Sequence, residues 1–266
     1  GKAFVASIDC HTVHALDAAS GKEAWSYTVG GRVDSPPAIW QGRALFGSAD
    51  GFVYCLTAAD GRLVWRFQAA PQDCRLMAEE QLESVWPVPG SVLVREGIVY
   101  CVAGRSMWLD GGLRLLRLDA RTGQMLSETI LDDKYPGTRD NLQRDIKWPN
   151  LPVALPDVLS CDGQNIFLRD KRLDADGIEQ EPNVPHLYSS AGLLDDNWWH
   201  RTYWVYGTKV YGRASGWAVV GNYVPSGRLL VLDETSVYGF GRKRIGGGDR
   251  GLSDVSLHLF RADQEV

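Results

Sequence analysis

The sequence predicts an all-β fold, a β-propeller made of four-stranded antiparallel blades. A segment of roughly 40 residues, the size of one propeller blade, repeats along the 266-residue chain. Within each copy, apolar residues alternate with small or polar ones over short runs, which is the pattern of a strand rather than a helix. Clusters of Gly, Asp and Ser separate the runs, as turns separate strands. One such sheet cannot bury both of its faces, so we expect neighbouring copies to stack.

The first two copies match over two stretches and end in the same motif. Residues 1–9 match residues 42–50, and the turn at residues 18–21 matches the turn at residues 58–61. In each copy a tryptophan stands four positions after the last glycine of this turn. We expect the first copy to form one four-stranded sheet. Its strands are predicted at residues 3–7, 13–17 and 23–29 and near residues 37–40.

A third copy occupies residues 98–130 and keeps the turn at residues 120–123, but it has Ser127 where the tryptophan should stand. Later strands are predicted at residues 165–171, 201–207, 228–241 and 257–261. The chain would then hold about five to six blades, fewer than the larger propellers contain. The last of these strands has no Gly-x-x-x-Trp after it. We therefore expect residues 1–266 to form a single propeller domain, an incomplete arc that is part of a larger ring.

The segment from Leu16 to Trp25 carries a specific resemblance. It is similar to the tryptophan-docking motif of PQQ-like β-propeller repeats, the family of quinoprotein alcohol dehydrogenases and of a lipoprotein of outer-membrane assembly. The match is strong over residues 1–70, fair to residue 130 and weaker beyond. The resemblance implies that Trp25 and Trp65 pack between adjacent blades. It also implies a bacterial protein outside the cytoplasm, periplasmic or secreted.

Composition excludes several classes of partner. The formal net charge is -5, and acidic and basic residues alternate along the chain, so nucleic acid is not an expected partner. No apolar run approaches the ~20 residues that span a bilayer, so we expect no transmembrane segment. The five cysteines show no C-x-x-C spacing. Cys55 and Cys101 lie in apolar strand runs and are expected to be buried, whereas Cys74 lies in a polar loop and is the one to test for reactivity.

The long insertions are predicted to gather on one face of the propeller, which is the usual binding face of a repeat protein. They span residues 68–91, 104–112, 132–157, 172–185 and 208–227. These loops carry carboxylate, guanidinium and aromatic side chains that suit a polar organic ligand. The candidate ligand-binding residues are Glu83, Trp86, Arg105, Asp110, Arg213 and Trp217, with Trp108 in the same loops. The alternative is that the loops cover one another, with Trp86 anchoring its own loop.

A second candidate site lies at residues 195–200. Its aromatic residues stand beside acids and a histidine, as in a carbohydrate platform or an acid–base site. The residues are Asp195, Trp198, Trp199 and His200. Packing of the two tryptophans between blades is the competing interpretation. No metal site is predicted, because His11 and His14 are three apart on a strand and point to opposite faces.

Three functions follow, in order of preference. The first is a propeller scaffold that binds a small polar ligand, a carbohydrate or a protein, without catalysis and without a cofactor. The second is a quinoprotein dehydrogenase, for which the resemblance implies PQQ and calcium in the central funnel. Against it, the adjacent cysteine pair of many such enzymes is absent. The third is a lyase or hydrolase of carbohydrates, with His200 or Asp110 paired to a second acid.

Overall fold

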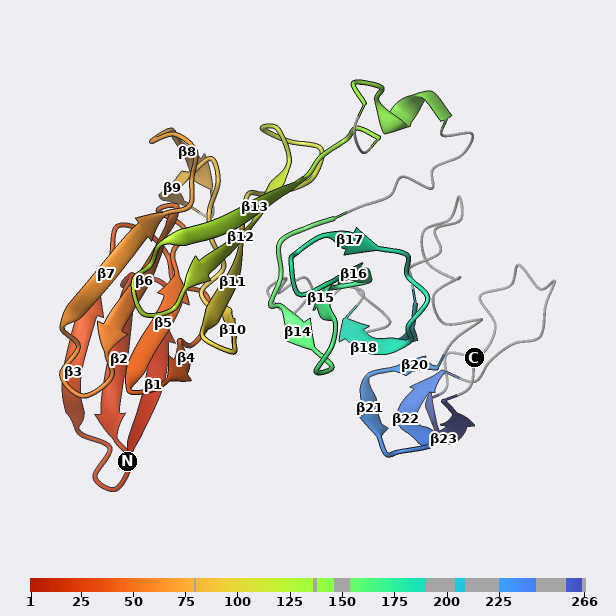
Figure 1. Cartoon of the computed structure of the whole chain (residues 1–266). Coiled ribbons are helices and arrows are strands. Elements are labelled where there is room, and N and C mark those ends of the chain that lie inside the picture. Colours follow the sequence, from red (N-terminus) through yellow and green to blue (C-terminus); the bar gives the residue numbers. More distant parts are fainter. Residues whose placement is uncertain are drawn as a thin grey trace. The chain divides into compact units, whose positions relative to one another are not determined.

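The computed structural model of the chain is a propeller-type, all-β structure, as predicted (Figure 1). It describes residues 1–78, 80–135, 138–145, 154–189, 204–208, 225–242 and 257–264. The helical content of these residues is one short 3₁₀-helix, Leu142–Asp145. The chain divides into two compact units, the first made of Gly1–Asp133, Val153–Leu168 and Asp174–Ile178. The second consists of Lys134–Pro152, Arg169–Leu173 and Glu179–Val266.

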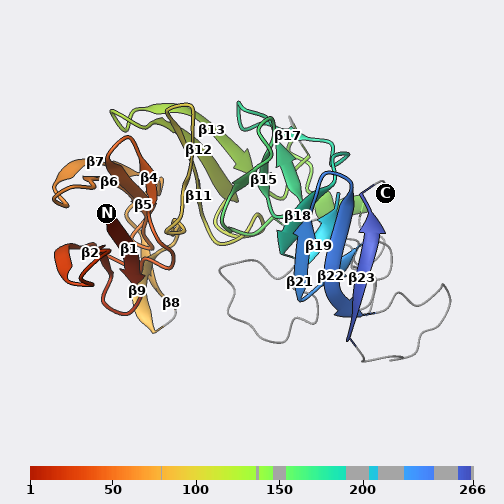
Figure 2. The same cartoon turned by 90° about the horizontal axis from the view of Figure 1, so that it is seen from below.

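The first unit holds three successive sheets, which follow one another side by side (Figures 1 and 2). The first sheet has the order β1-β2-β3, with strands Lys2–Ser7, Thr12–Asp17 and Glu23–Thr28. The second has the order β4-β5-β6-β7, with strands Ala38–Trp40, Arg43–Gly47, Phe52–Thr57 and Leu63–Gln68. The third has the order β10-β11-β12-β13, with strands Leu93–Arg95, Ile98–Ala103, Leu113–Asp119 and Met125–Leu131.

Two hairpins complete the first unit. β8 (Arg75–Ala78) pairs with β9 (Gln81–Ser84) inside the predicted insertion at residues 68–91. β14 (Ser160–Cys161) pairs with β15 (Ile166–Leu168). The third copy of the repeat, residues 98–130, lies in the sheet β10-β11-β12-β13, as its sequence predicts. The number of blades in the whole chain stays a prediction. The single domain over residues 1–266 also stays a prediction.

The strand near residues 37–40 belongs to a different sheet from the one expected. It was predicted as the fourth strand of the first sheet, but β4 is the first strand of the second sheet and pairs with β5. The reason is local: Trp40 lies opposite Arg43, and the two residues between them, Gln41 and Gly42, both have positive φ. A two-residue loop of this kind matches the twist of a tight hairpin and pairs neighbouring strands.

Two apolar cores hold the three sheets together. Alternation along β5 and β6 gives the second sheet two apolar faces. One face packs against Val13, Ala15 and Trp25 of the first sheet. The other face packs against the third sheet through the buried side chains Leu45, Val53, Cys55, Val99, Cys101, Leu116 and Leu118. Cys55 and Cys101 are buried as predicted, and burial raises the pKa of the Cys101 thiol to about 12.

Trp25 and Trp65 occupy the equivalent positions that the repeat predicts. Trp25 lies opposite Ala15 and Trp65 lies opposite Cys55 in their sheets. Each indole Nε1 donates a hydrogen bond to a carbonyl oxygen of the next sheet, at Ala58 (3.1 Å) and Ala120 (3.2 Å). Trp25 is buried and Trp65 is half-buried. Both tryptophans therefore connect adjacent sheets, which is a structural role rather than contact with a ligand.

The second unit has a hairpin and two sheets. β16 (Lys171–Leu173) pairs with β17 (Glu179–Gln180). One sheet has the order β18-β19-β20, with strands His186–Ser189, Trp204–Gly207 and Ser226–Gly227. The other has the order β21-β22-β23, with strands Leu229–Leu232, Ser236–Arg242 and Leu257–Asp263. β16, β19, β21, β22 and β23 overlap the later strands predicted from the sequence, whereas β17, β18 and β20 lie outside the predicted ranges.

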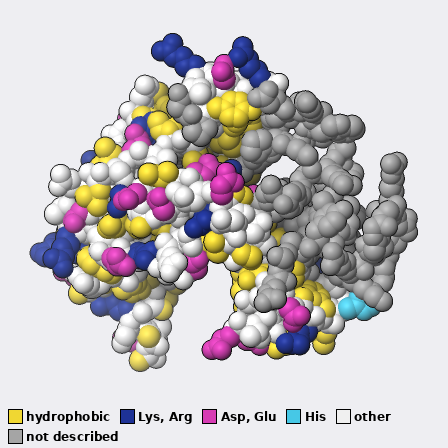
Figure 3. Space-filling model, turned by 45° about the vertical axis from the view of Figure 1, so that its right-hand side comes forward, with side chains coloured by type: hydrophobic (Ala, Val, Ile, Leu, Met, Phe, Trp, Pro, Cys, Tyr) yellow, Lys and Arg dark blue, Asp and Glu magenta, His cyan; other side chains and the backbone are white. Residues whose placement is uncertain are grey.

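The described surface carries no large block of one charge on the face in Figure 3, where acidic and basic side chains lie interspersed among hydrophobic ones. Among the described residues, no helix has the length and hydrophobicity needed to cross a bilayer.

Candidate functional site

Three of the predicted ligand-binding residues converge in the first unit. The indole Nε1 of Trp86 donates a hydrogen bond to the backbone carbonyl of Asp110, 3.1 Å away. The side chain of Asp110 accepts an ion-paired hydrogen bond from Nη2 of Arg105 at 2.5 Å. We call Trp86, Arg105 and Asp110 the Trp86 cluster. Arg105 and Asp110 are each about one third exposed, at 33% and 31%, so solvent and a ligand can reach both.

The loop between β11 and β12 is held in place at its start and in its middle. At its start, the amide of Gly104 donates to the carbonyl of Pro87, 3.0 Å away. In its middle, the amide of Met107 donates to the carbonyl of Ala154 at 3.0 Å, and the Met107 side chain is buried. The first bond ties the loop to the segment that carries Trp86, and the second ties it to Ala154. The cluster therefore stands on a fixed loop.

Three successive residues with positive φ place the Asp110 side chain at the tip of this loop. Asp110 has φ 53°, followed by Gly111 at 84° and Gly112 at 97°. Gly112 cannot be replaced without displacement, since a Cβ there would lie 2.5 Å from the carbonyl oxygen of Leu131. Asp tolerates the left-handed region better than most residues. The turn thus aims the Asp110 carboxylate back at Arg105.

Leu109 is a member of this site that the sequence reasoning did not single out. Its side chain is 48% exposed, beside Asp110 at the tip of the loop. Its neighbour Trp108 is half-buried, and the Trp108 backbone amide donates a hydrogen bond to the Ser106 hydroxyl oxygen at 3.2 Å. The sequence does indicate Leu109, because it is an apolar residue between two candidate residues, Trp108 and Asp110, in the predicted insertion at residues 104–112.

Glu83 has a different environment from the cluster. It lies in β9 and is only 3% exposed. Nε of Arg32 donates to its Oε1 at 2.8 Å, and Nη2 of the same arginine lies 3.4 Å from Oε2. The guanidinium compensates the charge of the buried carboxylate, and removing either partner would leave an uncompensated buried charge. In the structure, Glu83 therefore anchors the hairpin to the segment before β4.

The remaining candidates lie outside the described residues. These are Arg213, Trp217, Asp195, Trp198, Trp199 and His200. Their roles stay predictions.

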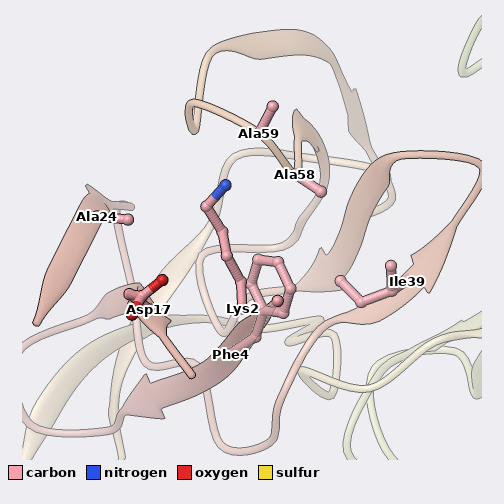
Figure 4. A pocket seen from close by; sticks show the side chains of 8 residues that line it. Lys2, Phe4, Asp17, Ala24, Ile39, Ala58 and Ala59 are labelled. Carbon is pink, nitrogen blue, oxygen red and sulfur yellow. The ribbon is translucent and has the colours of Figure 1, made fainter. Parts of the chain in front are cut away.

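A separate open hollow of about 540 Å³ lies along the edge of β1 (Figure 4). Lys2 and Phe4 of β1 point into it, with Ala58 and Ala59 of the next sheet's turn on the other side. The carboxylate of Asp17 also lines it. That carboxylate is engaged in its own turn, because the hydroxyl and the amide of Ser20 both donate to Oδ1, and these bonds lower its pKa. Lys2 and Asp17 are the charged side chains that line the hollow, and the rest of its lining is largely apolar.

The described residues do not supply the donor set of a metal centre. No three His, Cys, Asp or Glu side chains among them come together, and the five cysteines are all free thiols. The described part of the chain therefore does not fit a calcium ion bound by carboxylates, and we derive no step through PQQ. In the Trp86 cluster, the one acid is paired with an arginine and no histidine is among its described partners. The cluster is suited to hydrogen bonding and apolar contact.

The sequence model of one protein family matches residues 1–147, and its description is outer membrane protein assembly factor BamB. The chain belongs to this family. The match includes the three sheets of the first unit and the whole Trp86 cluster.

The chain is also similar to curated proteins and to solved structures. The chain is 31% identical over 122 residues to the dehydrogenase subunit of a quinone alcohol dehydrogenase from Komagataeibacter europaeus. That match covers 42% of this chain and 16% of the relative. The chain is also similar to the crystal structure of BamB from Moraxella catarrhalis, with a TM-score of 0.50 and 15% identity, over 89% of this chain and 66% of that one. The structural likeness supports the propeller fold.

Proposed function

We propose that this chain is a non-catalytic propeller scaffold that binds a protein partner through the Trp86 cluster and Leu109. The observation that supports it is that one fixed loop carries an arginine and an exposed leucine and accepts a hydrogen bond from the indole of Trp86. Tryptophan and arginine are the residue types that contribute most to binding energy at protein interfaces. A loop that is already ordered loses little conformational entropy on binding.

The partner class follows from the family. Its model is described by outer membrane protein assembly, so the partner is a protein of that process, and the scaffold lies outside the cytoplasm. Among the described residues, no three His, Cys, Asp or Glu side chains form a group that could hold a metal ion, which is compatible with a binding role. We infer that the scaffold needs no cofactor for it.

The test is a photo-crosslinking residue placed at Leu109 in the chain expressed in its own cells. The control carries the same residue at Met125, which is equally exposed at 47% but lies on β13 away from the loop. We expect a covalent adduct with an outer-membrane assembly protein from position 109 alone. Trp86→Ala and Arg105→Ala in the same chain should reduce the adduct. Equal adducts from both positions, or none from position 109, would contradict the proposal.

The dehydrogenase is the competing function, because part of the chain is similar to a quinone alcohol dehydrogenase subunit. Purified chain would be mixed with PQQ and calcium, and uptake followed by the absorbance of the cofactor. Stoichiometric, calcium-dependent uptake with alcohol oxidation would favour the enzyme. If the chain neither takes up PQQ in the presence of calcium nor oxidises alcohol, the scaffold remains the better account.

A further inference from the structure

Three equivalent rows of side chains cross the three sheets of the first unit. The pairing registers define them: each row takes one residue from the inner strand, one from the middle strand and one from the outer strand. The rows are Phe4–Ala15–Trp25, Leu45–Cys55–Trp65 and Tyr100–Arg117–Ser127. In the first two rows the large aromatic donor is on the outer strand. In the third row the outer residue is a serine, and a tyrosine and an arginine take the other two places.

Each tryptophan row docks on the next sheet in the same way. The indole nitrogen donates to an alanine carbonyl, and the indole ring lies against the glycine of the same turn. A Cβ at Gly61 would be 2.7 Å from the Trp25 ring, and a Cβ at Gly123 would be 2.7 Å from the Trp65 ring. Both glycines have positive φ, at 72° and 74°. The contact combines a neutral hydrogen bond with apolar packing.

The third row docks on a turn of the same kind, Asp174–Ile178, without a tryptophan. The hydroxyl of Tyr100 donates to the carbonyl of Ala175 at 2.8 Å, in the manner of the indole nitrogen in the other rows. Gly177 of this turn has φ 79°, and a Cβ there would lie 2.9 Å from Leu115. Tyr100 itself is 2% exposed. The donor to the alanine carbonyl has therefore moved from the outer strand to the inner strand.

Arg117 adds an ionic contact that neither tryptophan row contains. Its Nη1 lies 2.9 Å from Oδ1 of Asp176, and it also donates to the hydroxyl of Ser127 at 3.3 Å. The guanidinium lies over the Tyr100 ring, 5.9 Å from its centroid. The Arg117 side chain is 16% exposed, whereas the Asp176 side chain is 72% exposed. Dissolved ions can therefore reach one side of the pair.

We propose that the row Tyr100–Arg117–Ser127 is a salt-responsive lock that replaces a tryptophan lock, so that rising ionic strength selectively loosens the turn Asp174–Ile178. The physical reason is screening. The Debye length falls from about 10 Å at 0.1 M salt to about 3 Å at 1 M salt, which weakens ion pairs that solvent reaches. Apolar packing and neutral hydrogen bonds in the two tryptophan locks lack this dependence. The third junction is thus the one whose opening the ionic medium controls.

The test is amide hydrogen exchange of the full chain, read by mass spectrometry in NaCl at about 0.05 M and about 1 M. Peptides that contain the turn Asp174–Ile178 are compared with peptides that contain Gly61 and Gly123. We expect exchange in the Asp174–Ile178 turn to rise about two- to fivefold at high salt, the range that one exposed ion pair supplies. The turns at Gly61 and Gly123 should keep their rates. Equal acceleration of all three turns, or of none, would overturn the proposal.

A matched pair of variants isolates the ion pair. Asp176→Asn removes the carboxylate next to Gly177, and Asp60→Asn makes the same change next to Gly61, where the described bond of Asp60 stays within its own turn. Both sites are exposed, so both variants should fold. Asp176→Asn should speed exchange at low salt and abolish the salt dependence, and Asp60→Asn should change neither. If Asp176→Asn keeps the salt dependence, the lock does not depend on this pair.

Tyr100→Phe separates the hydroxyl from the ion pair. It removes the donor to Ala175 while leaving Arg117 and Asp176 in place. We expect faster exchange of the turn at both salt concentrations, with the ratio between them retained. Should Tyr100→Phe fail to fold, Asp176→Asn decides the proposal alone. A Tyr100→Phe variant that loses the salt dependence would contradict the assignment of that dependence to Arg117.

Discussion

The indole nitrogen of Trp25 and the backbone carbonyl of Ala58 form a hydrogen bond of 3.1 Å between the first and second sheets. The donor comes from the outermost strand of one sheet, and the acceptor comes from the turn after β6 in the next. A side chain in this position links two sheets that share no backbone hydrogen-bond ladder. The tryptophan therefore fixes how the sheets stack, in addition to filling the space between them.

We predict that Trp25→Phe lowers the free energy of unfolding by about 1–2 kcal/mol, because an aromatic ring remains but the Ala58 carbonyl loses its donor. Urea unfolding followed by circular dichroism would measure the change. Trp40→Phe is the control, since no described hydrogen bond of Trp40 involves its indole nitrogen, and a Cβ built at Gly97 would lie 3.6 Å from its ring, an ordinary contact distance. Equal stability of the two variants would contradict a role for the hydrogen bond.

A glycine pair tests whether the turn is a docking platform. Gly21 and Gly61 have nearly the same φ, 68° and 72°, so alanine costs similar backbone strain at both. They differ in surroundings: a Cβ at Gly21 meets nothing within 4 Å, whereas a Cβ at Gly61 lies 2.7 Å from the Trp25 ring. We predict that Gly61→Ala destabilises the chain by about 1–3 kcal/mol more than Gly21→Ala, by overpacking. Thermal or urea unfolding of the two variants would show it, and equal losses would refute the docking.

The fold was largely predictable because its signals are local and repeated. Alternating apolar residues set the strands of the first three sheets, and the turn glycines set their ends. The tryptophan positions followed from their spacing to those glycines. What the sequence reasoning got wrong was the sheet to which β4 belongs. Strand spacing alone does not distinguish the end of one sheet from the start of the next, and the decisive detail was a two-residue loop at Gln41 and Gly42.

The candidate site was predictable as a set of loops but not as a set of partners. Trp86 and Asp110 are 24 residues apart, and their hydrogen bond uses a backbone carbonyl, which leaves no trace in residue types. Glu83 is a residue type that suits a ligand contact, yet its carboxylate forms an ion pair with Arg32, 51 residues away in the sequence. The exchange of tryptophan for Tyr100 and Arg117 is visible in the sequence only as a missing tryptophan at Ser127. Long-range pairing decides such cases.

We predict that Glu83 contributes to stability through Arg32. Glu83→Gln keeps the size of the side chain but replaces the carboxylate 2.8 Å from the Arg32 guanidinium with a neutral amide at a 3% exposed site, while Asp34 stays 3.8 Å from the guanidinium. The free energy of unfolding should fall by about 1–3 kcal/mol. Glu23→Gln is the control, because the Glu23 side chain is half exposed in its pair with His14, so its replacement should change stability less than Glu83→Gln does. Chemical unfolding near pH 7 measures the free energy of unfolding of both variants. An unchanged free energy of unfolding for Glu83→Gln would contradict the structural role of the carboxylate and favour a contact with a ligand.

The turn at Asp119 should make part of the stability depend on pH. The Thr122 hydroxyl donates to Asp119 Oδ1 at 2.9 Å, and the amides of Thr122 and Arg121 also donate to it. These bonds lower the pKa of the Asp119 carboxyl below its ordinary value of 3.8, with the hydroxyl of Thr122 the largest cause. A carboxyl with a lowered pKa in the folded state stabilises that state above the unfolded-state pKa. This stabilisation is lost as the pH falls through the folded-state pKa.

We therefore predict that Asp119→Asn is less stable than the natural chain at pH 7, and that the difference shrinks as the pH falls below 3.8. The difference between the two unfolding curves isolates this residue, because other turn aspartates with lowered pKa values, such as Asp17 and Asp233, titrate in both proteins. Urea unfolding at a series of pH values gives the curve. A difference that stays constant from pH 7 to pH 3 would mean that Asp119 acts by its shape in the turn and not by its charge, since an asparagine at this position can still accept the backbone hydrogen bonds while carrying no charge to titrate.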